Sequence, residues 1–330
     1  MANPAAYLIH EDQKRTAETL KDVLGDGSFY TLEYLSDYRL GEVLASGASN
    51  GDELKNVLSK LLIADRLPAP SFGAGCSAFI AKNREGHVIV GRNYDFTHEL
   101  SSMLVRTSPE GGYKSMGMID LGFLDIGPGQ LSDGKTDHSL LMMMPYMTLD
   151  GINERGFFIS VLQLRGVETH QDTGKTKIMT TTAIRAVLDR AANVGEAEEI
   201  FRSYDMHTAR EKNDYHFFVA DRSGASAVFE YFNNEFNVIR TDCVTNFMMS
   251  PGARKRGGGK ERFRIIDSVL RYRSGSLEKD EAMDTLRLVS QPYPPKGKSN
   301  TLWSAVYDLT DGTLELATGR RYGEPMNFRL

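Results

Sequence analysis

Four paired β-rich runs, each joined by a turn-forming segment, constrain the fold of this chain more than any other feature of its sequence. The paired runs lie at residues 76–96, 139–164, 215–232 and 301–318. Pairs of helical runs lie between the second and third of them and between the third and fourth, at residues 181–192, 194–204, 260–272 and 277–289. Paired runs around such turns are typical of β-hairpins. Hairpins that alternate with helix pairs predict an α+β fold, with two antiparallel sheets and helices packed on their outer faces.

The first 75 residues differ in character from the rest of the chain. Apolar residues recur at helical spacing in "EDQKRTAETLKDVL" (11–24) and "GDELKNVLSKLLIADRL" (51–67). The stretch "LPAPSFGAG", with its prolines and small residues, then ends this pattern. Most of the net charge of −5 also lies in this segment. We therefore expect two units, a helical N-terminal segment (1–75) and a second domain (76–330).

Composition and cysteine usage exclude several classes of protein. A net charge of −5 gives no electrostatic basis for binding nucleic acid, and no apolar run is long enough for a membrane span. The two cysteines, Cys76 and Cys243, form no CxxC pair, and the first residues lack a secretory pattern. We therefore expect a cytoplasmic protein with free thiols. We expect neither a metal nor a cofactor, because no ligand cluster is visible and "RGGGK" lacks the spacing of a phosphate-binding loop.

Cys76 opens the first hairpin directly after Gly75, which raises the question of what would activate its sulfur. A cysteine is a nucleophile only as the thiolate, so a base must take its proton. None of the seven histidines lies in a cysteine-protease signature, and we expect His87 and His216, which open predicted strands, to be structural. Cleavage of the bond between Gly75 and Cys76 would supply another base, an α-amine with a pKa of about 8. Gly75 suits this cleavage because, without a Cβ, it leaves room for the sulfur to attack its carbonyl, and the segment upstream would then be a propeptide.

Several motifs of this chain resemble those of one enzyme group, and they occur in the same order. They are "GCSAF" with "GRNYDF", "DGINERGFFISVLQLRG", "VTNFM", "ERFR" and "WSAVYDLTDGTLELAT". The group comprises choloylglycine hydrolases, penicillin V acylases and acid-ceramidase-like enzymes, which are linear amide C–N hydrolases of the N-terminal nucleophile (Ntn) superfamily. The resemblance extends from Cys76 to Leu330 and implies an Ntn-hydrolase αββα sandwich, preceded by a helical propeptide-like segment. It also implies activation by autoproteolysis between Gly75 and Cys76.

The resemblance assigns roles to three residues of the first hairpin. Cys76 would be the nucleophile and, through its freed amine, the acid and base. Asp95 would hold that amine, and Arg92, which is always cationic, would lower the pKa of the thiol. The odd separation of Arg92 and Asp95 places them on opposite faces of a strand unless it bends near Asn93. A structural ion pair is the alternative for these two residues.

The later motifs supply the rest of the implied site. Asn246 of "VTNFM" would donate its side-chain amide to the tetrahedral oxyanion, with the backbone N–H near Gln163 as the second donor. Arg262 of "ERFR" would complete the polar network. For Asn246 the structural alternative is the cap of a turn, and Cys243 is expected to be a small core residue. Gln163 stands where many bile-salt hydrolases have Asn and many penicillin V acylases have Tyr, so it favours neither substrate.

Hydrolysis of an N-acyl amide through an acyl-thioester is the reaction that the resemblance implies. The small-molecule substrate would be a conjugated bile salt, penicillin V or a fatty-acyl amide. Acyl transfer of the isopenicillin N acyltransferase type is a second hypothesis, and an unprocessed, non-catalytic binder of lipids or bile acids is a third; a homo-oligomer also stays open. The runs "LLMMMPYM", "FFISVL" and "FMM" would line an apolar acyl pocket or simply form core, and the basic segment 254–262 is expected to be a flexible loop.

Overall fold

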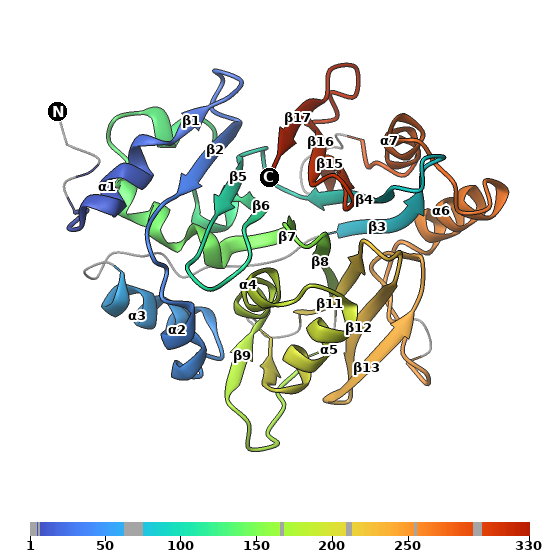
Figure 1. Ribbon diagram of the computed structural model, residues 1–330, viewed down its shortest axis with the longest axis horizontal. Coiled ribbons are helices and arrows are strands. Elements are labelled where there is room, and N and C mark those ends of the chain that lie inside the picture. Colours follow the sequence, from blue (N-terminus) through green and yellow to red (C-terminus); the bar gives the residue numbers. More distant parts are fainter. Residues whose placement is uncertain are drawn as a thin grey trace.

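A nine-stranded and a six-stranded β-sheet stack face to face at the centre of the part of the chain that the structure describes (Figure 1). This computed structural model describes residues 5, 7–62, 75–165, 168–208, 213–253, 256–292 and 299–330. The larger sheet has the strand order β1-β2-β5-β6-β7-β8-β11-β12-β13, and the smaller has the order β14-β3-β4-β15-β16-β17. Strands β9 and β10 form a separate parallel pair.

The bounds of these elements are as follows. The larger sheet consists of β1 (Lys21–Asp22), β2 (Phe29–Tyr34), β5 (Ser102–Thr107), β6 (Ser115–Asp120), β7 (Thr148–Asn153), β8 (Phe157–Arg165), β11 (Asn213–Asp221), β12 (Ser226–Phe232) and β13 (Glu235–Arg240). The smaller sheet consists of β14 (Cys243–Val244), β3 (Gly75–Lys82), β4 (Val88–Phe96), β15 (Asn300–Asp308), β16 (Thr313–Thr318) and β17 (Met326–Arg329). The separate pair is β9 (Lys177–Met179) and β10 (Asp205–His207). The helices are α1 (Glu11–Glu18), α2 (Leu40–Ser46), α3 (Gly51–Leu61), α4 (Thr180–Arg190), α5 (Val194–Arg202), α6 (Lys260–Tyr272) and α7 (Lys279–Leu288), with 3₁₀ helices η1 (Leu121–Leu124), η2 (Gln130–Ser132) and η3 (His138–Met147).

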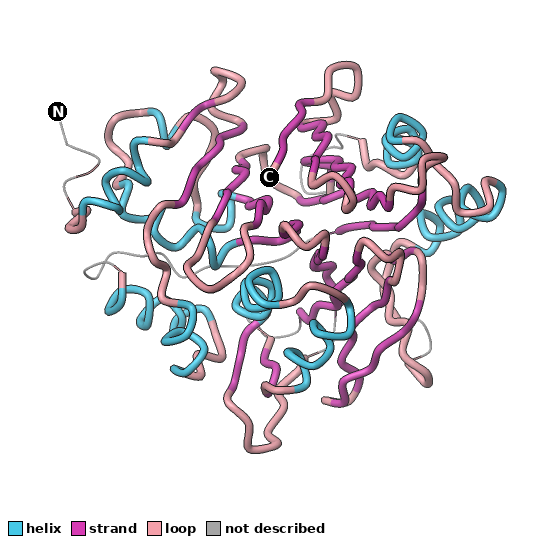
Figure 2. The backbone as a smooth tube through the Cα atoms, viewed as in Figure 1, coloured by secondary structure: helices cyan, strands magenta, loops and turns pink. Residues whose placement is uncertain are grey.

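Helices cover the outer faces of the two sheets. Helix α4 packs on β7 and β8 and α5 on β11 and β12, whereas α6 and α7 pack on β3, β4 and β15 of the smaller sheet. This is the αββα arrangement of Ntn hydrolases that the sequence predicted, and Figure 2 shows the strands of both sheets between the helices. Helix α4 is buried almost from end to end, because α2 packs on it in addition to the sheet. Among the described residues, no helix combines the length and the hydrophobicity needed to cross a bilayer.

Most of the predicted elements of the second domain are confirmed. Three of the four predicted hairpins are present, at residues 76–96, 215–232 and 301–318. The four predicted helices are present as α4, α5, α6 and α7, within a few residues of the expected bounds. The second hairpin is shorter than predicted, because β7 begins at Thr148 and the Met-rich run before it forms the 3₁₀ helix η3. Pro145 lies inside this run and has no N–H to donate to a neighbouring strand.

The N-terminal segment is not wholly helical, contrary to the prediction. Helix α1 ends at Glu18, and the chain continues into the edge strand β1 and its neighbour β2. Strand β2 pairs in parallel with β5, with Phe29 opposite Ser102 and Tyr34 opposite Thr107. Its sequence "FYTLEY" is rich in the aromatic and β-branched residues that favour strands. Helical periodicity in the flanking residues concealed this strand, whose partner lies far away in the sequence.

The N-terminal segment also shares the core of the second domain. Phe29, Tyr30 and Leu32 of β2 are fully buried in the same apolar cluster as Cys76. Helix α3 confirms the second predicted helix of the segment over Gly51–Leu61, and residues 63–67 of that prediction lie outside the described residues. The segment is therefore packed as part of the sheet and core rather than as an appendage.

A buried carboxyl group in β11 makes the stability of the fold depend on pH. Asp214 is 2% exposed and is hydrogen-bonded to the Thr169 hydroxyl and the Tyr215 backbone N–H. Burial raises its pKa from 3.8 to about 6. Because the folded state holds this proton more tightly than the unfolded state, the stability contribution of Asp214 is greatest below pH 4 and falls as the pH rises towards 6.

We therefore expect Asp214→Asn to be more stable than the wild type at neutral pH. The variant cannot ionise, so its advantage in unfolding free energy should grow by about 1 kcal/mol between pH 5 and pH 7.5. Urea denaturation of both proteins at the two pH values measures this difference. A difference that does not change with pH would contradict the assignment.

Candidate active site

The first hairpin pairs β3, which carries Cys76, with β4, which carries Arg92 and Asp95. In the register of β3 and β4, Cys76 lies opposite Tyr94, Gly75 opposite Asp95 and Ala78 opposite Arg92. Directly opposed side chains share a face, and faces alternate along a strand. Cys76 and Arg92 therefore point towards the larger sheet, whereas Asp95 points towards the helices, as the odd spacing of Arg92 and Asp95 predicted.

Arg92 is a buried cation held between the two sheets. Its Nη2 donates to the carbonyl of Val161 in β8 at 2.8 Å, and its Nε pairs with the carboxylate of Asp150 at 3.3 Å. Asp150 also accepts from Trp303 Nε1 (3.3 Å) and from the Tyr307 hydroxyl (2.5 Å). The buried pair of Arg92 and Asp150 is therefore hydrogen-bonded by its surroundings, and these bonds fix the guanidinium in one orientation.

The Cys76 thiol lies in a strongly desolvated position. Its side chain is fully buried, and this burial raises the pKa of the thiol, while the nearby Arg92 guanidinium opposes the shift. The uncleaved chain therefore holds a protonated thiol that needs a base before it can react. Sequence reasoning identified Arg92 but missed Asp150, the buried carboxylate that orients it, although Asp150 opens the "DGINERG" motif.

Asp95 is the centre of a second polar cluster, on the helix side of β4. Its Oδ2 accepts from Arg262 Nη1 at 3.1 Å and from Gln291 Nε2 at 2.6 Å, and its Oδ1 accepts from the Thr301 hydroxyl at 2.6 Å. A bulge in β15 between Thr301 and Trp303 opposes Asp95 and brings the hydroxyl to it. Burial raises the pKa of Asp95, and the charge of Arg262 opposes that shift. Gln291 and Thr301 belong to none of the predicted motifs.

Asn246 and Arg262 connect these groups to the backbone of Cys76. Asn246 Oδ1 accepts from the Cys76 N–H at 2.6 Å and from Arg262 Nη2 at 2.9 Å. Arg262 Nη1 donates to the Cys76 carbonyl at 2.8 Å. The side-chain amide of Asn246 donates to the carbonyl of Gln163 at 3.0 Å. The structure thus places Asn246 and Arg262 on the backbone of Cys76, with Gln163 and Asp95 as their partners, whereas Arg92 lies on the thiol side of the strand.

A cavity of about 370 Å³ opens beside this network. Its wall consists of Gly75, Phe96, Thr97, Gln163, Asn246, Gly257, Gly258, Gly259, Arg262, Gln291 and Ser299. Residues 257–259 belong to the segment that we expected to be a flexible basic loop; they form one wall of the cavity, and α6 begins directly after them. Residues 254 and 255 of that segment lie outside the described part of the chain. Met142, Met143 and Met144 are fully buried in the core and are not part of this wall, which fits the alternative that their run forms core.

Gly257 of this loop lies so close to the backbone of Asn246 that a side chain has no room. It has a φ of +111°, and a Cβ would lie 2.2 Å from the Asn246 carbonyl oxygen. We expect Gly257→Ala to cost about 1–3 kcal/mol of stability and to lower kcat, because Asn246 must move. The matched variant Gly258→Ala should change stability by less than about 0.5 kcal/mol, since its Cβ would meet no described atom within 4 Å. Urea denaturation and steady-state kinetics measure both effects, and equal costs at the two positions would contradict this explanation.

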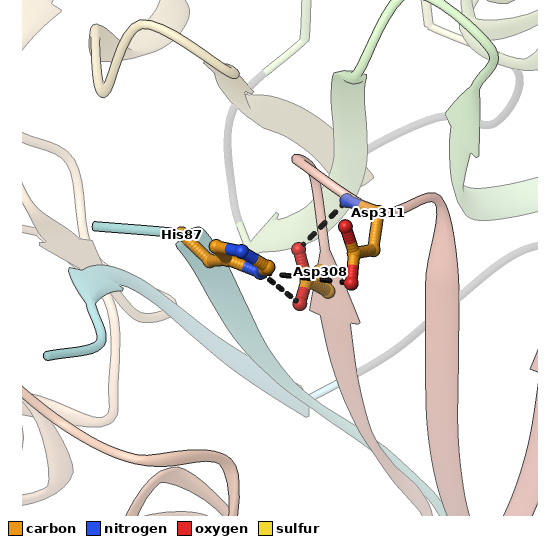
Figure 3. Close-up of side chains that lie close together, drawn as sticks. All are labelled: His87, Asp308 and Asp311. Carbon is orange, nitrogen blue, oxygen red and sulfur yellow. Dashed lines mark hydrogen bonds and ion pairs between the residues drawn. The ribbon is translucent and has the colours of Figure 1, made fainter. Parts of the chain in front are cut away.

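A second group of titratable side chains, at the far end of the first hairpin, is an ion cluster. His87 Nδ1 lies 3.2 Å from Asp308 and 3.7 Å from Asp311, an arrangement that could ligate a cation (Figure 3). The Lys279 ammonium already lies 2.9 Å from the same Asp308 oxygen. The hydrogen bond between His87 and Asp308 raises the pKa of the His87 imidazole. We therefore interpret the group as a structural link between β4, β15 and α7.

Comparison with known proteins finds one family model and several solved structures that are similar to this chain. A model of the linear amide C–N hydrolases, choloylglycine hydrolase family, matches residues 76–247, which is just over half of the chain. Among solved structures, two variants of the conjugated bile acid hydrolase from Clostridium perfringens have TM-scores of 0.58 and 0.59 at 15% and 16% identity, and each comparison covers 77% of this chain and 92% of the hydrolase. Penicillin V acylase from Agrobacterium tumefaciens has a TM-score of 0.54 at 20% identity, covering 77% of this chain and 85% of the acylase. No curated protein matches the chain by sequence.

Proposed function

This chain belongs to the choloylglycine hydrolase family of linear amide C–N hydrolases, and from that membership we propose that it cleaves an N-acyl amide with Cys76 as nucleophile and the freed α-amine of Cys76 as acid and base. The observation that carries the proposal is the polar network around the backbone of Cys76. Its N–H and C=O are bound by Asn246 and Arg262 at 2.6 and 2.8 Å. A cysteine that only filled the core would not need such partners for its own peptide groups beyond those of the sheet.

We propose that the chain activates itself by cutting the bond between Gly75 and Cys76. The Cys76 sulfur attacks the Gly75 carbonyl, its proton passes to the Cys76 nitrogen, and the C–N bond breaks to leave a thioester. Water then hydrolyses this thioester and releases the Gly75 carboxylate, the thiol and the α-amine. A glycine suits the position, because a Cβ would already contact Gln291 Nε2 and Ser299 Oγ at 3.3 Å.

In turnover, the α-amine takes the place of the peptide N–H beside Asn246. The amine accepts the thiol proton, the sulfur attacks the acyl carbonyl, and Arg92 stabilises the developing thiolate on its own side of the strand. Asn246 donates its side-chain amide to the oxyanion, a contact worth about 3 kcal/mol of barrier in comparable sites. The ammonium then protonates the leaving amine, and water cleaves the acyl-thioester.

We also propose that the two units, 1–75 and 76–330, stay together after cleavage. Strand β2 of the first unit is paired along its length with β5 of the second, and its aromatic side chains are buried in the common core. The cleaved enzyme should therefore run as two bands on a denaturing gel and elute as one species in native size-exclusion chromatography. Elution of fragment 76–330 alone, in active form, would contradict this proposal and would favour a propeptide that leaves.

The substrate class is tested with purified, cleaved enzyme and a panel of glycine and taurine bile conjugates, penicillin V and fatty-acyl amides. The names of the similar structures support bile conjugates and penicillin V as substrates. Hydrolysis of either substrate gives an amine and a carboxylic acid. Product analysis with and without a competing acceptor amine distinguishes hydrolysis from acyl transfer, because a transferase forms the new amide in place of the free acid. Free acid as the main product supports the proposal. A full-length chain that turns over no acyl amide would overturn it and favour a binding protein.

Both cysteines are free thiols, which supports a reducing compartment such as the cytoplasm.

A further inference from the structure

A buried histidine and glutamate lie directly behind the segment that carries Asn246. His216 in β11 and Glu230 in β12 are both completely buried, and His216 Nδ1 lies 3.0 Å from Glu230 Oε2. Both strands belong to the larger sheet, and neither residue belongs to a motif of the predicted site. Burying such a pair is costly unless its hydrogen bonds are well made, so its partners indicate what it holds.

The remaining hydrogen bonds of the pair all go to the backbone around Asn246. His216 Nε2 lies 2.9 Å from the carbonyl oxygen of Thr245, the residue directly before Asn246. A carbonyl oxygen only accepts, so Nε2 carries the proton of this bond. Glu230 accepts from the backbone N–H of Met249 at 2.9 Å and from that of Ser250 at 2.7 Å. The pair therefore fixes the segment at both ends.

The opposite side of the same segment is held by the glycine loop. The Asn246 carbonyl accepts from the Gly258 N–H at 2.8 Å, and the Thr245 hydroxyl donates to the Gly259 carbonyl at 3.0 Å. The segment around Asn246 is thus held from two sides. Its outer contacts are hydrogen bonds to the backbone of the glycine loop, and its inner contacts are hydrogen bonds to the buried side chains of His216 and Glu230. The inner contacts are the rigid ones, because they come from fully buried side chains on two interior strands of a sheet.

We propose that His216, held by Glu230, is a positioning residue that sets the side chain of Asn246 against the reacting acyl group. The proposal rests on the oxyanion role of Asn246 in the proposed function. The hydrogen bonds described for His216 go to Glu230 and to the Thr245 carbonyl, so it acts on Asn246 through that carbonyl. Its removal should misplace the oxyanion donor and lower kcat by about 10- to 100-fold, with little change in KM.

Two isosteric substitutions separate the two hydrogen bonds of the imidazole. In His216→Gln the amide nitrogen replaces Nε2 and keeps a donor for Thr245, whereas in His216→Asn it replaces Nδ1 and loses that donor. We expect kcat to fall in the Asn variant and to recover within a few-fold of wild type in the Gln variant. Similar losses in both, together with similar melting temperatures, would overturn the proposal. Glu230→Gln, which should also lower kcat, replaces the Asn variant if that protein does not fold.

A double-mutant cycle with Asn246→Ala tests whether His216 acts through Asn246. In the Asn246→Ala background, His216→Asn should lower kcat by less than about two-fold, because the donor that it positions is gone. The same fold-loss in both backgrounds would show a general structural role and overturn the proposal. An Asn246→Ala enzyme with unchanged kcat would also overturn it, but would leave Cys76 chemistry intact if Cys76→Ala is inactive.

Discussion

Replacement of Cys76 by alanine is expected to abolish turnover and to leave the chain uncut, a loss of activity of at least about 10³-fold. The same sulfur attacks the Gly75 carbonyl in cleavage and the acyl carbonyl in turnover, so one substitution removes both reactions. Intact-mass measurement reports the cleavage, and release of the amine from an acyl amide reports turnover. Cleavage at Gly75 in the alanine variant would point to an outside protease.

Cys243→Ala is the matched control for the only other cysteine of the chain. Cys243 lies opposite Phe79 in the core behind the site, and burial raises its pKa to about 12, so it supplies no thiolate at neutral pH. The variant should be cut and active, with a modest loss of stability from the small cavity. Loss of cleavage in this variant would mean that the assignment of the nucleophile is wrong.

Arg92→Met is expected to have the largest effect on stability as well as abolishing activity. It leaves Asp150 as a buried carboxylate without its cation, which costs about 3–5 kcal/mol. The double variant Arg92→Met/Asp150→Asn removes that uncompensated charge and should recover part of the lost stability, because the amide still hydrogen-bonds to Tyr307 or Trp303. It should recover no activity, since the thiolate still lacks its cation.

Urea denaturation and amide turnover of the two single variants and the double variant test this expectation. Stability that recovers without activity separates the structural ion pair from the catalytic effect of the guanidinium. Purely additive stability costs of the two substitutions would contradict the ion pair. Recovery of activity in the double variant would contradict the role of Arg92 at the thiol.

The elements that could be predicted from the sequence are those whose signal is local. The hairpin of β3 and β4 has a short Gly-containing turn and two short β-rich runs, and helices α4 to α7 have clear periodicity, so both kinds of element were identified. Strands β2 and β5 pair in parallel across a long separation, and no local pattern indicates that partner. The run before Thr148 has strand-like composition, but its proline and its burial on all sides make it a 3₁₀ helix.

The candidate site divides in the same way. Residues within motifs, such as Arg92 and Asn246, could be named from the sequence. Gln291 and His216 could not, because they come from distant segments and are ordinary polar residues until the fold brings them close to Asp95 and Asn246. Asp150 lies in a motif, but only the fold shows that it pairs with Arg92. His216 was expected to open a strand and to be structural, so its bond to the Thr245 carbonyl beside Asn246 was not indicated by the sequence.

N-terminal sequencing of fully active protein, combined with its intact mass, is the most direct test of the claim that the catalytic base is created by cleavage. We predict two chains, one of which begins with Cys76, in proportion to the measured activity. Full activity in material whose Gly75 and Cys76 are still joined by a peptide bond would contradict the claim.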